Sequence, residues 1–121
     1  MFVRQKAYQN AIQTVTINFG SLLGDEYKDE DAGVTLKELP TLEMMKMSEA
    51  KEQGQVKLLE YFKEVLPEII TDHNLYETED KKMEKKDVAE LIFDKFEITV
   101  KVVNEYCSAA FFTRLNKKEG K

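Results

Sequence analysis

Residues 55–69 read QVKLLEYFKEVLPEI, and this stretch is the clearest indication of the fold in the chain. Apolar residues recur in it at spacings of three and four, while lysines and glutamates occupy the opposite side. This pattern is typical of an amphipathic helix, whose apolar stripe packs on a core. Pro67 lies near its end, where the ring removes a hydrogen bond and clashes with the preceding turn, so we expect a kink or termination there. The apolar positions are Leu58 or Leu59, Phe62, Val65 or Leu66, and Ile69.

Upstream of this helix, the first third of the chain is typical of extended structure. Residues 34–39, VTLKEL, alternate apolar and polar side chains with a period of two, and an earlier group of apolar residues is interspersed with threonines. We therefore expect two antiparallel β-strands, with helices covering one face because a two-stranded ribbon is marginal by itself. Residues 20–33 between them form an acidic loop, whose charge predicts a long solvated connection. The earlier apolar residues are Ile12, Val15, Ile17 and Phe19.

A second helix is expected between the strands and residue 55. Pro40 should end the second strand, and Thr41 is placed to cap a helix that ends near Gly54. The helix contains Met44, Met45 and Met47. Unbranched methionine side chains repack easily and suit a partner-binding surface, but their helical spacing favours a place in the core.

The last third of the chain predicts a polar connector followed by further helix. Residues 72–86 are mixed in charge and have no periodicity. Asp87 followed by Glu90 has the spacing of a reciprocal helix cap. An apolar helical pattern then resumes or continues to Phe112, and residues 116–121 form a charged tail. The apolar positions are Val88, Leu91, Ile92, Phe96, Ile98, Val102, Tyr106, Ala109 and Ala110.

These segments together predict one domain, residues 1–121, of the α+β class and mainly α. Its N-terminal β-hairpin region spans residues 1–39, and its helical region, residues 40–115, forms a bundle of about four helices. A chain of 121 residues is long enough to bury a sizeable core.

The composition argues against several classes of partner. The chain has 18 Lys and Arg against 23 Asp and Glu, a formal charge of −5, which repels nucleic acid unless basic residues gather on one face. No window has the length and apolar character of a signal peptide or a membrane span. The single cysteine, Cys107, forms no internal disulfide and lies in an apolar stretch. We therefore expect a cytoplasmic protein without nucleic-acid or membrane partners.

No motif in the sequence specifies a chemistry. The acidic loop lacks the spacing of a calcium loop, because the twelfth place counted from Asp29 is Pro40. His73 is the only histidine and is expected to be a polar turn residue or a helix-end contact, since one imidazole does not assemble a zinc site. No glycine-rich phosphate loop is present. We expect no catalytic residue, cofactor or metal, and the alternative is an enzyme centred on His73 and Glu77.

The last helical region carries more apolar residues than one packing stripe requires. The surplus predicts burial against something else, either a second copy of the chain or the helix of another protein. The predicted partner-binding residues are Val103, Tyr106, Ala110, Phe111, Phe112 and Leu115.

Three stretches carry a resemblance to a known family. They are VTLKELPT at residues 34–41, LLEYFKEVLPEIITDHNL at residues 58–75, and DVAELIFDKFEITVKVVNEY at residues 87–106. In their order and their short phrases they resemble the phage and prophage tail assembly chaperones. The resemblance covers roughly residues 30–110.

The resemblance implies a chaperone that works without ATP. Such a protein binds the long, helical, aggregation-prone tape-measure protein, helps tail tube protein assemble on it, and is absent from the mature virion. Two alternatives remain open: a small acidic regulatory protein that neutralises a basic partner, as an antitoxin does, and a structural tail-completion protein.

Overall fold

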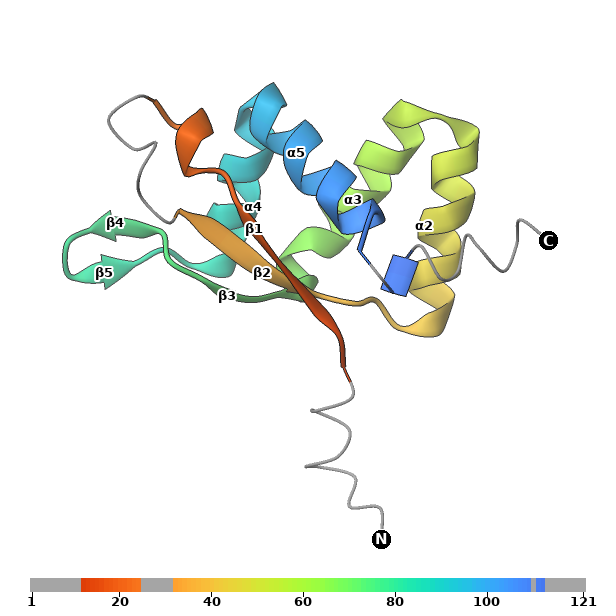
Figure 1. The fold of residues 1–121 in the computed structure, drawn as a ribbon, viewed down its shortest axis with the longest axis horizontal. Coiled ribbons are helices and arrows are strands. Elements are labelled where there is room, and N and C mark those ends of the chain that lie inside the picture. Colours follow the sequence, from red (N-terminus) through yellow and green to blue (C-terminus); the bar gives the residue numbers. More distant parts are fainter. Residues whose placement is uncertain (1–11, 25–31, 110, 113–121) are drawn as a thin grey trace, which may run out of the picture.

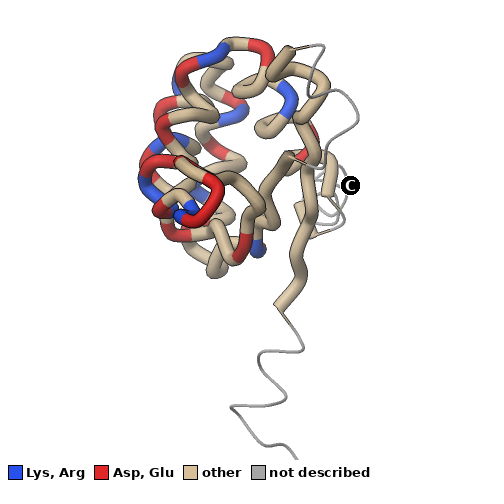
Figure 2. The backbone as a smooth tube through the Cα atoms, turned by 90° about the vertical axis from the view of Figure 1, so that its left-hand side faces the viewer, with Lys and Arg blue, Asp and Glu red and all other residues tan. Residues whose placement is uncertain are grey.

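A computed structural model describes residues 12–24, 32–109 and 111–112 of the chain. The described part combines a small antiparallel sheet with helices packed on one side of it, as Figures 1 and 2 show. The fold is α+β and mainly α, with an N-terminal hairpin before the helices, which confirms the predicted class. Residues 25–31 of the acidic loop, Ala110, and the predicted tail at 116–121 lie outside the described residues.

The predicted hairpin is present. Strand β1 (Thr14–Asn18) pairs antiparallel with β2 (Gly33–Lys37), and Thr16 stands opposite Thr35. Alternation decides which side chains face the helices, because successive residues of a strand point to opposite faces. Ile17, Val34 and Leu36 are buried, whereas Thr14 and Thr16 are exposed. A short 3₁₀ helix, η1 (Gly20–Leu22), follows β1.

The prediction that residues 72–86 form only a polar connector is wrong, because this segment contains strands. Strand β3 (Ile70–His73) follows the long helix directly and adds a third strand to the sheet, in the order β1-β2-β3. Two shorter strands, β4 (Tyr76–Thr78) and β5 (Lys81–Lys82), then form a separate exposed hairpin. Both strands of this hairpin are exposed on both faces, so their sequence lacks the alternation of apolar and polar residues that predicts a strand.

The two central helices lie where the periodicity predicts them. Helix α2 (Thr41–Gln53) ends at Gly54, and α3 (Gln55–Ile69) ends two residues after Pro67. The predicted cap at Thr41 is wrong, because Pro40 occupies the N-cap and no side chain caps the helix. Gly54 has a φ of 121°, a conformation that glycine adopts at little cost, and it allows the chain to reverse between α2 and α3.

The last helical region consists of two helices, so the apolar pattern resumes after a break, and the four α-helices of the described residues agree with the predicted bundle of about four. Helix α4 (Lys85–Asp94) begins earlier than predicted, with Glu84 at its N-cap, so the expected reciprocal cap between Asp87 and Glu90 is also wrong. Lys95 adopts an extended conformation, and α5 (Phe96–Cys107) starts immediately after it. This break changes the direction of the chain and decides where Phe96 points.

One hydrophobic cluster joins the sheet to the helices. Phe62 lies near its centre, with its ring centroid 5.4 Å from that of Tyr106 and 6.2 Å from that of Phe93. The Tyr106 hydroxyl donates a hydrogen bond to the backbone oxygen of Lys37, at 2.9 Å, which connects α5 to the end of β2. Met44 and Met47 are buried in this core and Met45 is 40% exposed, so the core placement holds for two of the three methionines.

Candidate functional site

The residues predicted to bind a partner lie inside the protein. Val103, Tyr106, Phe111 and Phe112 are all buried, and the ring of Phe111 lies 5.1 Å from that of Tyr106. The apolar surplus of the last helical region therefore packs on the chain's own sheet and helices, not on a second surface. In this conformation these four side chains are not accessible to a partner. The other two predicted residues, Ala110 and Leu115, lie outside the described residues.

His73 is a buried strand residue, not the polar turn residue or helix-end contact predicted. It stands opposite Val34 in the sheet, and its Nδ1 accepts a hydrogen bond from the backbone N–H of Leu75 at 3.1 Å. This bond places the proton of the neutral imidazole on Nε2. Glu77, its partner in the enzyme alternative, is exposed on β4 and lies 3.7 Å from the ammonium group of Lys81. His73 therefore has a structural contact that accounts for its position.

Cys107 is buried, as expected from its apolar surroundings. Burial raises the pKa of its thiol, and the nearby Lys51 offsets only part of that rise. A thiol acts as a nucleophile in its thiolate form, and this environment disfavours the thiolate at neutral pH.

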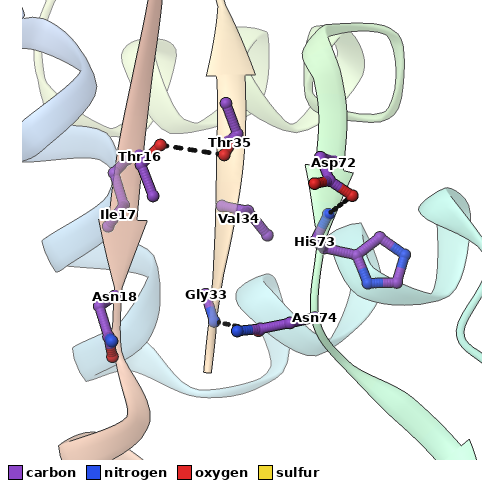
Figure 3. A pocket seen from close by; sticks show the side chains of 9 residues that line it. All are labelled: Thr16, Ile17, Asn18, Gly33, Val34, Thr35, Asp72, His73 and Asn74. Carbon is purple, nitrogen blue, oxygen red and sulfur yellow. Dashed lines mark hydrogen bonds between the residues drawn. The ribbon is translucent and has the colours of Figure 1, made fainter. Parts of the chain in front are cut away.

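A polar hollow of about 290 Å³ lies on the sheet and is lined by residues of all three strands and of the turn after β3 (Figure 3). Its polar groups bond to one another: the hydroxyls of Thr16 and Thr35 are 3.0 Å apart, and the side-chain oxygen of Asn74 accepts the N–H of Gly33 at 2.8 Å. A hydrogen bond from Lys82, first among several causes, lowers the pKa of the Asp72 carboxyl. Within residues 12–24, 32–109 and 111–112, no cluster of acidic, histidine or cysteine side chains is suited to hold a metal ion. The hollow is therefore an internally bonded surface.

A second hollow, of about 400 Å³, is mainly apolar and lies between α3 and the junction of α4 with α5. We name it the α3–α5 groove and define it by its lining residues. Two of them are large apolar side chains that are mostly in water, Val56 at 69% and Phe96 at 76% exposure, and two others, Leu59 and Phe93, are partly buried. The groove is therefore an accessible apolar surface and a candidate site for another molecule. The full lining is Val56, Leu59, Glu60, Lys63, Phe93, Asp94, Phe96 and Thr99.

Two local features of the chain form this groove. Val88 and Ile92 form the buried face of α4. The break at Lys95 turns Phe96 away from this face and toward water. Thr99 holds the break in place, since its hydroxyl lies 2.6 Å from the backbone oxygen of Ile92 and donates a hydrogen bond to it. The groove therefore depends on the junction between α4 and α5.

The groove was not predicted from the sequence, because the apolar spacing places Phe96 on one face with Val88 and Ile92. The available signal was weak: Val56 falls outside the stripe that Leu58 and Phe62 begin, and a lone exposed valine is ordinary on a protein surface. Only the position of Phe96 next to the Asp94-Lys95 pair hinted at a helix end.

The described part of the chain contains no helix long and apolar enough to cross a membrane. Comparisons of the whole sequence with protein-family models, with curated proteins and with solved structures found no match.

Proposed function

We propose that this protein is a non-catalytic tail assembly chaperone of a phage or prophage, which binds the tape-measure protein and assists assembly of the tail tube protein on it. The observation that carries the proposal is the α3–α5 groove, where Val56 and Phe96 expose most of their apolar surface. The order of a strand, an amphipathic helix and a closing helical region, in which the sequence resembles that family, supports the choice of partner.

The physical requirements of such a role agree with the properties of this chain. A client with long apolar helical faces aggregates unless those faces are covered, and a covering protein must itself stay soluble. The formal charge of −5 favours solubility, and the groove supplies a restricted apolar contact. Because the groove is small, each contact is weak and reversible, which suits a chaperone that leaves once the tube has assembled.

In this proposal the protein acts in the host cytoplasm and is absent from the mature virion. It has no cofactor, and it binds neither nucleic acid nor membrane. Any homo-oligomer forms through surfaces other than the buried residues of α5, because those residues already pack in the core.

The test is affinity purification of the tagged protein from cells that express its native gene neighbourhood, followed by mass spectrometry of the retained proteins. We expect the tape-measure protein to be retained. A small basic partner in its place would support the antitoxin-like alternative, and detection of this protein in mature particles would support a tail-completion protein.

A pair of matched double variants tests the groove in the same experiment. Val56→Ser with Phe96→Ser removes the two exposed apolar groups of the groove and should abolish retention. Leu42→Ser with Met45→Ser removes two exposed apolar groups on α2, outside the groove, and should leave retention unchanged. Equal loss in both variants, or in neither, would show that the groove is not the binding site.

A further inference from the structure

The two walls of the α3–α5 groove carry opposite unpaired charges. Lys63 lies on the α3 wall, and Asp94 lies at the end of α4 on the other wall. Neither side chain forms an ion pair with any residue that the structure describes. The third charged lining residue, Glu60, has the ammonium group of Lys57 at 4.0 Å, so its charge is partly balanced on its own helix. A partner in the groove therefore meets the unpaired Lys63 on one wall and the unpaired Asp94 on the other.

The exposed apolar area of the groove limits the size of its occupant. At 69% and 76% exposure, the side chains of Val56 and Phe96 together leave roughly 250 Å² in water. A stable interface between two copies of a protein buries about 800 Å² on each side. The groove alone is too small to hold a second copy, but its area matches the apolar stripe of one short helix.

The walls of the groove also decide the secondary structure of the occupant. Both are helices, whose backbone groups bond within the helix, so they offer no open strand edge to a partner. An extended peptide would gain no backbone hydrogen bonds from such walls. A helix satisfies its backbone internally and lays an apolar face into the groove.

We infer that the α3–α5 groove binds one amphipathic helix of a partner protein, with apolar residues on Val56, Leu59, Phe93 and Phe96. A basic flank of this helix faces Asp94, and an acidic flank faces Lys63. The inference rests on the proposed protein-binding function and adds the chemistry of the partner segment. Charges on the two flanks fix the direction in which the helix lies, because reversal places like charges together.

Three synthetic helical peptides of about 18 residues, a length that supports helix formation, test the inference. All share one leucine stripe. The mixed peptide carries lysine on one flank of the stripe and glutamate on the other. The lysine peptide carries lysine on both flanks, and the glutamate peptide carries glutamate on both. Binding to the full chain is measured by fluorescence anisotropy. We expect the mixed peptide to bind about threefold more tightly than either of the others, as exposed ion pairs of this kind allow.

Substitutions in the protein test whether the peptides bind in the groove. Val56→Ser with Phe96→Ser should weaken binding of the mixed peptide at least tenfold, and both side chains are exposed enough for the fold to tolerate the change. Asp94→Lys places a lysine on each wall and should shift the preference to the glutamate peptide. Asp80→Lys changes the charge by the same amount on the β4–β5 turn, outside the groove, and should leave the preference for the mixed peptide.

Two results would overturn the inference: unchanged peptide binding by the groove variants with an unchanged melting temperature, or a dimer in sedimentation that Phe96→Ser dissociates. These results are distinct from failure of the proposed function. If the tape-measure protein is retained but the peptide preferences are absent, the function stands and the inference fails. If the peptides bind as expected but no tape-measure protein is retained, the inference stands and the proposed client is wrong.

Discussion

At Gly33, the first residue of β2, a side chain has no room. A Cβ atom built there would lie 2.1 Å from the backbone oxygen of Ile17 and 2.9 Å from the Cα of Asn18. Both contacts are with backbone, which has no flexible end that moves aside. Gly33 also donates its N–H to Asn74, so it connects β1, β2 and the turn after β3. The close approach of the three segments at this point requires glycine.

We predict that Gly33→Ala destabilises the protein by about 1–3 kcal/mol, the usual cost of an added group in a packed site. The lower backbone entropy of alanine in the unfolded chain offsets about 0.4–1 kcal/mol, so the steric term dominates. Urea denaturation followed by circular dichroism measures the effect, with Ser21→Ala at an exposed site as the control. An unchanged midpoint would mean that the strands separate to admit the methyl group at little cost.

At the scale of elements, the junction of α4 and α5 is the feature that determines the candidate site. Carbonyl groups in the last turn of a helix lack helical partners. The buried hydroxyl of Thr99 lies 2.6 Å from the Ile92 oxygen and 3.1 Å from the Lys95 oxygen, so α5 provides the missing donor for the end of α4. This contact fixes one helix relative to the other and thereby places Phe93 and Phe96 on the same side.

We predict that Thr99→Val, which keeps the shape but removes the donor, costs about 1–3 kcal/mol because a buried carbonyl loses its partner. Peptide binding by the groove should weaken as well, since the junction is no longer fixed. Thr78→Val on the exposed strand β4 is the control and should change neither quantity. Full stability in the Thr99 variant, measured by urea denaturation, would show that another group supports the junction.

At the scale of the whole molecule, the contrast between two phenylalanines separates the core from the surface. Phe112 is fully buried, with the Lys51 ammonium group 5.5 Å from its ring centroid, whereas Phe96 is 76% exposed in the groove. The sequence pattern predicts the opposite roles, with Phe112 as a binding residue and Phe96 on an apolar helical face. Burial by segments distant in the chain decides between these roles.

We predict that Phe112→Ala lowers the free energy of unfolding by about 3–5 kcal/mol, the cost of emptying an aromatic site in a core. Phe96→Ala should change it by less than about 0.5 kcal/mol. Both values come from urea titrations of the purified variants. Similar losses in the two variants would contradict the assignment of Phe112 to the core and of Phe96 to the surface.

Local patterns in the sequence determined the fold class and most of the regular elements. The period of three and four in residues 55–69 placed α3, the alternation in residues 34–39 placed β2, and Gly54 marked the end of α2. These patterns suffice because each arises from neighbours within one element, whose geometry is the same in any protein. The charge of −5 likewise follows from the sequence alone.

Tertiary structure alone decided which apolar residues are available to a partner. The side chains of Val103 and Tyr106 on α5 are buried because α5 packs on α4, on β1 and on Phe62 of α3, and no local pattern encodes those distant contacts. Strand β3 exists because β2 offers it an edge, although its own residues are mostly polar. Phe96 faces water because the chain turns at Lys95, and that turn is stabilised by a hydrogen bond from Thr99, seven residues beyond its acceptor.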